Sequence, residues 1–351
     1  MLLFIFDSIS FDWLESYLTN RYQFTVVNDA ESALKGAKCG VPQGTVLGPL
    51  LFLLYINDIP NSLTKSQMKL FADDSNLFVI GNNVASLFNL ANNELSLLSQ
   101  WINANKLFIN YDKTNFMFFD PIKRHKVTNH SFDLPPLLLN NHQIERVHMV
   151  RYLGILIDDK LSWTEHINYL INRVSSICGI LYRTNQFLPM NCKKNIFYAL
   201  VYSVIIYCIE VYGNVNKTIL NPLLVKYNRL LRLLLHKPRR TRLYDLYSSF
   251  DTLPINLLFE FFTAKLIHKC LYDNIHVPVS ISRLFIPRSS MHSHNTRHSN
   301  TFFLNSNCNP KSIMFYGPSM WSKLPSHLQS VSSINVFLRN YKHYLFDTMR
   351  T

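Results

Sequence analysis

Two adjacent aspartates, Asp73 and Asp74, are the side chains of this sequence best suited to binding a metal ion. They stand between two short β-prone runs, 68–72 and 76–80, and directly follow Phe71 and Ala72, which predicts a hairpin with carboxylates at its tip. Mg²⁺ prefers oxygen ligands, usually one or two protein carboxylates together with substrate phosphates. Asp is also common in solvated turns, so the pair alone is weak support for a metal site.

A turn rich in glycine and proline precedes the aspartates, in the string GVPQGTVLGPLLF at 40–52. Pro42 and Gly44 flank Gln43, whose amide can both donate and accept hydrogen bonds, and glycine permits a ligand to approach the backbone closely. The apolar run 47–56 that follows predicts a helix buried on most of its sides. An ordinary strand-to-helix turn would explain the glycine and proline, but not the order of the whole string.

Charge is distributed unevenly along the 351 residues, whose formal net charge is +13. Residues 1–120 contain 7 basic and 11 acidic side chains, whereas residues 121–351 contain 28 and 11. The hydrophobic fraction of 48% excludes a wholly disordered chain. The basic second half predicts a polyanionic partner. Its densest segment, 226–242, is a helical pattern with no acidic residue and seven basic ones: Lys226, Arg229, Arg232, Lys237, Arg239, Arg240 and Arg242. A solvated amphipathic helix is the plain alternative; we favour contact with phosphates.

Hydrophobic spacing predicts an α+β fold that becomes mostly helical after residue 160. Helices are expected at 12–18, 47–56, 86–103, 163–183, 191–212, 222–236 and 334–349. Strands are expected in a pair at 107–110 and 115–119 and at 150–157, all on one sheet with the 68–80 hairpin. Six cysteines without C-x-x-C spacing favour a reducing compartment, nuclear or cytoplasmic, and no segment is long and apolar enough to cross a bilayer comfortably.

The string at 40–60, together with LFADDSNLF at 70–78, resembles the reverse transcriptase of non-LTR retrotransposons, nearest to jockey-like LINE elements. The resemblance continues through LSLLSQWINANKLFINYDKTNFMFF and VRYLGILIDDKLSWTEHI, and reaches HSHNTRH and YGPSMWSKLP near the end. It implies a palm domain over 1–160, a helical thumb over 161–245 and a C-terminal region over 246–351. It also implies an RNA template, a DNA primer and deoxynucleotides as partners, and two Mg²⁺ ions as cofactors.

The resemblance also implies roles for individual residues. Asp73, with Asp74 beside it, corresponds to the metal-binding aspartate of the family's third motif, which Phe71 and Ala72 lead into. Pro42, Gln43 and Gly44 correspond to the motif that contacts template and nucleotide, and Lys113 corresponds to a lysine that protonates pyrophosphate, although it could equally be an exposed turn residue. The primer grip corresponds to Tyr152, Leu153 and Gly154.

One part of the family's pattern is missing. A further metal-binding aspartate normally precedes the stretch that begins here at Trp13, with a helix and more between them. Only five residues separate Asp7 from Trp13, so we interpret it as a chance similarity. We therefore expect a truncated polymerase, inactive alone, with an incomplete two-metal site. The alternatives are a catalytically dead nucleic-acid-binding remnant or a module recruited by the host; a helical scaffold would leave the motifs unexplained.

Two other acidic or metal-like patterns are not assigned a site. Asp158 and Asp159 are expected in a solvated turn. The stretch 291–308, with several histidines and Cys308, fits no closed four-ligand zinc pattern, so we predict no zinc there.

Overall fold

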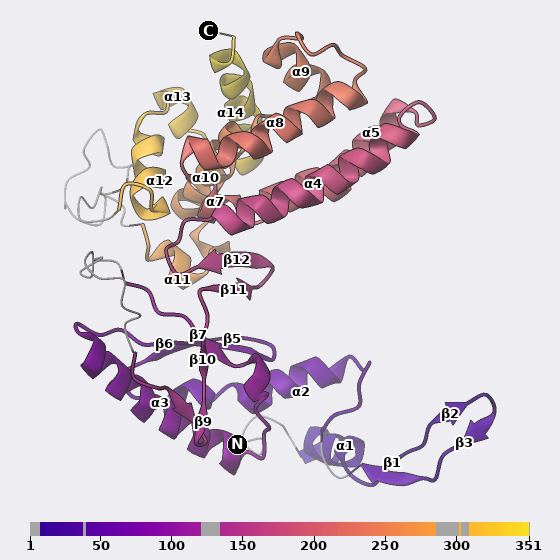
Figure 1. Ribbon diagram of the computed structural model, residues 1–351, viewed down its shortest axis with the longest axis vertical. Coiled ribbons are helices and arrows are strands. Elements are labelled where there is room, and N and C mark those ends of the chain that lie inside the picture. Colours follow the sequence, from indigo (N-terminus) through magenta and orange to yellow (C-terminus); the bar gives the residue numbers. More distant parts are fainter. Residues whose placement is uncertain (1–7, 38–39, 121–133, 286–301, 303–308, 351) are drawn as a thin grey trace. The chain divides into compact units, whose positions relative to one another are not determined.

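The computed structural model describes residues 8–37, 40–120, 134–285, 302 and 309–350 (Figure 1). The chain divides into two compact units. Unit 1 comprises Met1–Phe116 and His125–Arg146, and unit 2 comprises Met117–Arg124 and Val147–Thr351. Helices and small, mainly antiparallel sheets make up the described residues, which confirms the mixed α and β class. The palm, thumb and C-terminal assignments, with boundaries at 160 and 245, stay predictions.

The described residues of unit 1 form three α-helices, two 3₁₀ helices and five two-stranded sheets. In chain order its elements are α1 (Ser8–Leu18), β1 (Arg21–Gln23), β2 (Val26–Val27), β3 (Ala30–Glu31), β4 (Lys35–Ala37), α2 (Leu47–Ile56), β5 (Gln67–Phe71), β6 (Asp74–Phe78), α3 (Val84–Ala104), β7 (Asn115–Phe116), β8 (Leu138–Leu139), β9 (His142–Gln143) and β10 (Glu145–Arg146). β1 pairs with β4, β2 with β3, β5 with β6 and β8 with β9, all antiparallel, whereas β7 and β10 are parallel.

The core of unit 1 lies along one face of α3, as the helical spacing predicts. Asn83 caps this helix by accepting a hydrogen bond from the Ser86 amide at 2.8 Å. The buried side chains recur every three or four residues and pack against the segment before β5 and against β8: Phe88, Ala91, Leu95, Leu98 and Ile102. The segment before β5 includes a 3₁₀ helix (Ile59–Ser62) that contacts both α3 and β5.

Helix α2 has the predicted bounds but not the predicted burial. Only Gly48 and Ile56 are buried in it, while Leu50, Leu53 and Tyr55 are about half exposed. A helix that is apolar on every side needs neighbours on every side to be buried. In α2, the other described residues cover only part of the helix surface, so several apolar side chains stay exposed.

The predicted single sheet is wrong. The strands at 67–78, 115–116 and 149–158 belong to three separate two-stranded sheets among the described residues. Residues 107–110 form no strand, and Tyr111–Lys113 form a 3₁₀ turn because the Asn110 side chain accepts a hydrogen bond from the Lys113 amide at 3.2 Å. Local capping therefore replaces the expected hairpin, and β7 pairs with β10 instead.

The described residues of unit 2 form mainly a hairpin followed by helices. Its elements are β11 (Met149–Tyr152), β12 (Ile155–Asp158), α4 (Thr164–Thr184), α5 (Met190–Phe197), a π-helical turn (Tyr198–Tyr202), α6 (Ser203–Ile206), α7 (Ile209–Tyr212), α8 (Lys217–Leu234), α9 (Leu243–Phe250), α10 (Ile255–Tyr272), α11 (Val279–Ser282), α12 (Ile313–Ser322), α13 (Ser326–Gln329) and α14 (Ile334–Thr348). The predicted helices at 163–183, 222–236 and 334–349 are confirmed within a few residues. Helices on both sides of residue 245 share one hydrophobic core.

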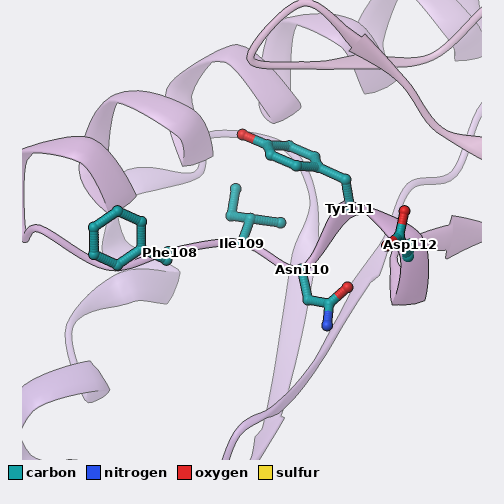
Figure 2. A pocket seen from close by; sticks show the side chains of 5 residues that line it. All are labelled: Phe108, Ile109, Asn110, Tyr111 and Asp112. Carbon is teal, nitrogen blue, oxygen red and sulfur yellow. The ribbon is translucent and has the colours of Figure 1, made fainter.

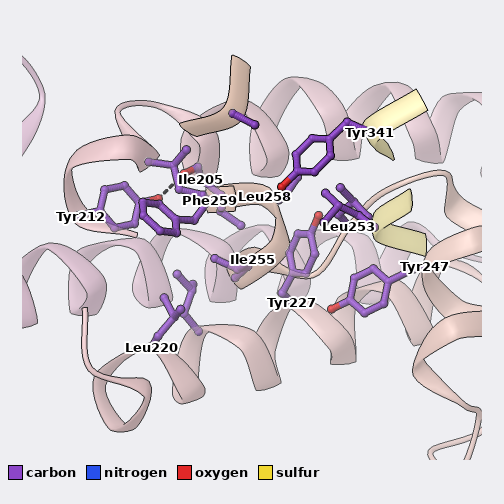
Figure 3. Close-up of a cluster of buried hydrophobic side chains, with 14 of the residues drawn as sticks. Ile205, Tyr212, Leu220, Tyr227, Tyr247, Leu253, Ile255, Leu258, Phe259 and Tyr341 are labelled. Atoms are coloured by element: carbon purple, nitrogen blue, oxygen red, sulfur yellow. Dashed lines mark hydrogen bonds between the residues drawn. The ribbon is translucent and has the colours of Figure 1, made fainter. Parts of the chain in front are cut away.

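Buried tyrosines are prominent in the unit 2 core (Figure 3). Each keeps its hydroxyl paired: Tyr212 donates to the Ile205 carbonyl, Tyr247 donates to the Asn228 amide oxygen, and Tyr227 lies 3.0 Å from the Thr252 hydroxyl. Large rings contribute much apolar area, while the paired hydroxyls avoid the cost of an unsatisfied buried polar group.

The helix predicted over 191–212 is interrupted. After the π-helical turn and α6, Tyr207 leaves the helical conformation and Cys208 has φ +54°. Such breaks often accompany functional positions. Here the break frees the Tyr207 side chain to contact the β11–β12 hairpin.

Candidate active site and nucleic-acid interface

The β5–β6 hairpin presents Asp73 and Asp74 at its tip, as predicted. Ala72 and Asp73 form the two-residue turn, and Asp74 is the first residue of β6, paired with Phe71. Ala72 has φ +49°, a left-handed conformation that costs about 1 kcal/mol for a residue with a Cβ atom. Both carboxylates are exposed. Neither forms a hydrogen bond or ion pair with any described residue, so their oxygens are available as ligands.

A buried carboxylate, Glu94 of α3, anchors the segment that leads into this hairpin. The side chain is 1% exposed. It accepts hydrogen bonds from the amides of Thr64 (3.1 Å), Lys65 (3.2 Å) and Ser66 (3.3 Å), and from the hydroxyls of Thr64 and Ser66 at 2.5 Å each. Burial opposes ionisation, but these donors outweigh it and lower the pKa of Glu94 from 4.5 to about 2. Sequence reasoning missed this role, although an acid on the apolar face of the predicted helix was the available signal.

The turn at Pro42, Gln43 and Gly44 is held by one hydroxyl. Thr45 Oγ1 donates to the Pro42 carbonyl at 2.9 Å and accepts from the Gly48 amide at 3.2 Å and from the Tyr17 hydroxyl at 2.9 Å. Gly44 has φ +77°, which glycine adopts without steric cost. Gln43 and Gly44 are exposed, and Pro42 is half-buried. No hydrogen bond joins this turn to Asp73 among the described residues.

Lys113 follows a shallow pocket of about 410 Å³ lined by residues 108–112 (Figure 2). Its side chain is exposed. Tyr111 fixes the pocket wall. Its ring stacks on His142 with ring centroids 4.1 Å apart, and its hydroxyl accepts a hydrogen bond from the side-chain amide of Asn140 at 3.1 Å. The structure thus places Lys113 on a supported 3₁₀ turn; its role stays a prediction.

Asp73 and Asp74 are the carboxylates that the described residues offer for the predicted metal site. Among the residues that the structure describes, no group of three or more His, Cys, Asp or Glu side chains could hold a metal ion. Asp7 and the zinc-like stretch 291–308, apart from Phe302, lie outside the described residues. The carboxylate chemistry of Asp73 and Asp74 fits a hard divalent cation, but two carboxylates offer few fixed oxygens for two ions.

The predicted primer grip, Tyr152, Leu153 and Gly154, forms the turn of the β11–β12 hairpin in unit 2. Leu153 (φ +44°) and Gly154 (φ +88°) are both left-handed. The Tyr207 hydroxyl donates to the Leu153 carbonyl at 2.7 Å and fixes this strained turn. The hairpin is also tied to α4, because the Leu156 amide donates to His166 Nδ1 at 3.4 Å.

His166 acts here as a neutral acceptor. It is 2% exposed, and burial, with a contribution from the nearby Arg151 charge, lowers its pKa to about 4. Its ring packs edge-on against Tyr212 at 4.7 Å.

The Asp158–Asp159 pair is not a solvated turn, contrary to the expectation. Burial opposes ionisation of Asp158, but its carboxylate accepts hydrogen bonds from the amides of Lys160, Ser162 and Trp163, which lower its pKa. Asp159 lies 2.6 Å from His148 Nδ1. Asp158 thereby fixes the connection from β12 into α4.

The seven basic residues predicted to contact phosphates differ in accessibility. Arg229, Lys237, Arg239, Arg240 and Arg242 are exposed, whereas Lys226 and Arg232 are half-buried. The four ion pairs of the described part of the chain include none of these side chains. Five unpaired cations are therefore open to an anionic partner.

These features accompany a match to a known family. Residues 2–157 match the family described as "Reverse transcriptase (RNA-dependent DNA polymerase)". Residues 2–157 are therefore a reverse transcriptase domain. The match includes the Pro42–Gly44 turn, the aspartate hairpin, Lys113 and the β11–β12 turn.

Relatives of the reverse transcriptase domain come from non-LTR mobile elements. The chain is similar to "RNA-directed DNA polymerase from mobile element jockey" of Drosophila melanogaster, 25% identical over 66% of this chain and 26% of that protein. It is 26% identical to the jockey protein of Drosophila funebris over 67% of this chain and 26% of that protein. It is 29% identical to "Probable RNA-directed DNA polymerase from transposon X-element" of Drosophila melanogaster over 47% of this chain and 18% of that protein. The chain spans about a quarter of the length of the jockey relatives.

Within the described residues, none of the helices combines the length and the apolar character needed to cross a membrane. The four described cysteines, Cys178, Cys192, Cys208 and Cys270, are free thiols.

Proposed function

We propose that this reverse transcriptase domain takes part in RNA-directed DNA synthesis by a non-LTR retrotransposon, with two Mg²⁺ ions, an RNA template, a DNA primer and deoxynucleotides. One observation carries the proposal: the matched domain presents Asp73 and Asp74, unpaired and exposed, at the tip of a hairpin whose base is anchored through Glu94. Fixed ligand positions matter because positioning and charge stabilisation supply most of the catalysis in phosphoryl transfer.

The chain's residues have distinct roles in this proposal. Asp73 is the main metal ligand and Asp74 supports it; bound Mg²⁺ would activate the primer hydroxyl and stabilise the leaving pyrophosphate. The exposed amide of Gln43 hydrogen-bonds template or nucleotide, since its turn is kept open by the Thr45 hydroxyl. Lys113 donates a proton to pyrophosphate. The turn at Leu153 holds the primer end.

We further propose that the 351-residue chain does not polymerise by itself. Two ions need more fixed oxygens than Asp73 and Asp74 provide, and the described residues offer no third carboxylate nearby.

Template-dependent incorporation by two proteins tests this proposal. The first is the 351-residue chain; the second adds, ahead of it, the corresponding upstream region of a jockey relative. We expect incorporation only by the second. Incorporation by the first protein that disappears in its Asp73→Ala variant would contradict the proposal that its metal site is incomplete, and would implicate Asp7 as a ligand.

A nucleic-acid-binding module without catalysis, either a degraded element copy or one recruited by the host, is the second candidate. The unpaired cations between 229 and 242 favour binding of phosphates independently of the metal site. Salt-dependent RNA binding together with no incorporation by either protein would support this candidate.

A further inference from the structure

Two large aromatic rings are exposed at the C-terminal end of α4. Tyr182 is 74% exposed and Phe187, in the turn after the helix, is 76% exposed. The neighbouring Leu181 is 1% exposed and belongs to the core of unit 2. The two rings therefore lie outside the packing that stabilises the helix, although each carries a large apolar surface.

Cationic side chains surround the same end of the helix. Arg183 is exposed beside Tyr182. The end of α4 is joined to the end of α8, because the side-chain amide of Asn185 donates a hydrogen bond to the Leu233 carbonyl at 2.7 Å. The Lys193 ammonium also lies 3.0 Å from His236 Nε2. Of the four exposed residues that directly follow His236, three are cationic: Lys237, Arg239 and Arg240. Figure 1 shows α4 and α8 side by side within this unit.

Almost nothing within the surrounding sequence neutralises these charges. Residues 166–244 contain 12 Lys and Arg but a single acid, Glu210. The ion pairs of the described part of the chain include no residue of this span. A partner for this surface must therefore bring negative charge, and flat apolar groups that can cover the two rings.

We propose that Tyr182 and Phe187, with Arg183 and the cations after α8, bind single-stranded nucleic acid, the rings stacking on unpaired bases while the cations contact phosphates. This inference rests on the proposed function, because it names a second contact for the same polymer. Exposed base faces exist in single strands and not inside duplexes, and base–aromatic stacking tolerates any sequence. An interfacial membrane anchor would need a continuous apolar face, whereas polar residues fill positions 183–186 between the rings.

Fluorescence anisotropy of the 351-residue chain with a labelled 20-nucleotide RNA lacking secondary structure, and with a fully paired 20-base-pair DNA duplex, tests the proposal. In Tyr182→Ala and in Phe187→Ala, single-strand affinity should fall about tenfold each, since each variant loses the stacking of one ring on a base. Duplex affinity should change less than twofold. Tyr182→Phe, which keeps the ring, should bind like the unchanged chain.

Ile180→Ala is the matched control, because Ile180 is an apolar, 57% exposed residue of the same helix without a π face. It should leave both affinities unchanged. Arg183→Glu should weaken the single strand and the duplex together, because it acts on phosphates. Thermal melts monitored by circular dichroism should be the same for all these variants, since the exposed side chains contribute little to stability.

Three results would overturn the proposal. One is equal loss of single-strand and duplex affinity in the two ring variants. The second is the same loss in Ile180→Ala. The third is ring-dependent binding to phosphatidylserine vesicles, or ring-dependent dimerisation in analytical ultracentrifugation, with RNA affinity unchanged. Failure of the polymerase proposal would look different, with no incorporation but ring-dependent single-strand binding retained.

Discussion

Glu94→Gln should weaken the part of the protein that positions the aspartate hairpin, β5–β6. The substitution keeps the size of the side chain but removes the charge, and it turns one acceptor oxygen into an NH₂ group facing the donors of Thr64, Lys65 and Ser66. Several amide and hydroxyl donors would then lose their partner inside a site that is almost closed to water. Such losses cost about 1–3 kcal/mol for each buried polar group left unsatisfied.

The pKa of Glu94 sets the expected magnitude. A fall from 4.5 to about 2 corresponds to about 3 kcal/mol of stabilisation of the charged form, at about 1.4 kcal/mol for each unit of pKa. Because the folded-state pKa is depressed, this stability is fully present above pH 4.5 and is lost as the pH falls from 4.5 towards 2. At pH 7 we expect Glu94→Gln to lower the free energy of unfolding of unit 1 by about 2–4 kcal/mol.

Hydrogen exchange measured by mass spectrometry is the suitable assay, because two units need not unfold together. Peptides covering 64–78 should lose protection in Glu94→Gln, while peptides from α8 keep theirs. In the unchanged chain, protection of 64–78 should fall between pH 4.5 and pH 2 after correction for intrinsic exchange. In the variant this pH dependence should be absent.

Glu15→Gln is the control, since Glu15 is an exposed acid of α1. It should change neither the protection nor its pH dependence. Equal protection of 64–78 in Glu94→Gln and the unchanged chain at pH 7 would refute the anchoring role of this carboxylate.

Three further substitutions probe the other elements. Thr45→Val removes the hydroxyl that holds the Gln43 turn and should reduce protection of the 45–48 amides by about 1–2 kcal/mol in hydrogen exchange; unchanged protection would contradict this role. Tyr207→Phe should loosen the Leu153 turn by about 0.5–1.5 kcal/mol, seen as faster exchange at 153–155, whereas an effect spread evenly over unit 2 would indicate general destabilisation. Arg239→Glu combined with Arg240→Glu should weaken RNA binding. It should also flatten the slope of log affinity against log salt by about one for each phosphate that the chain no longer neutralises. Binding that is insensitive to salt in the unchanged chain would exclude an interaction with phosphates.

Local sequence patterns predicted the parts of the fold that depend on neighbouring residues. The spacing of apolar residues located α3, α4, α8 and α14, because each buries one stripe against the core. The aspartate hairpin followed from two β-prone runs around Asp73. These signals depend on residues that lie close together in the sequence, so they can be recognised without knowing the tertiary structure.

Other features depend on contacts between segments distant in sequence, and no local pattern reveals them. The break at Tyr207 accompanies its hydrogen bond to Leu153, 54 residues earlier. The role of Glu94 depends on donors about 30 residues away. Likewise, Thr45 bonds to Tyr17 across 28 residues. The exposure of α2 could not be predicted from its composition, because a uniformly apolar helix gives no information about which faces have neighbours.

Primer extension by the longer protein, the 351-residue chain preceded by the upstream region of a jockey relative, tests the central claim most directly. The assay compares Asp73→Asn with Asp112→Asn, which alters an exposed acid of the same unit. We predict that Asp73→Asn lowers Mg²⁺-dependent incorporation about a thousandfold or more, since a metal ligand is lost, and that Asp112→Asn retains it. Equal incorporation by Asp73→Asn and the unchanged protein would contradict the assignment of Asp73 as the metal-binding aspartate.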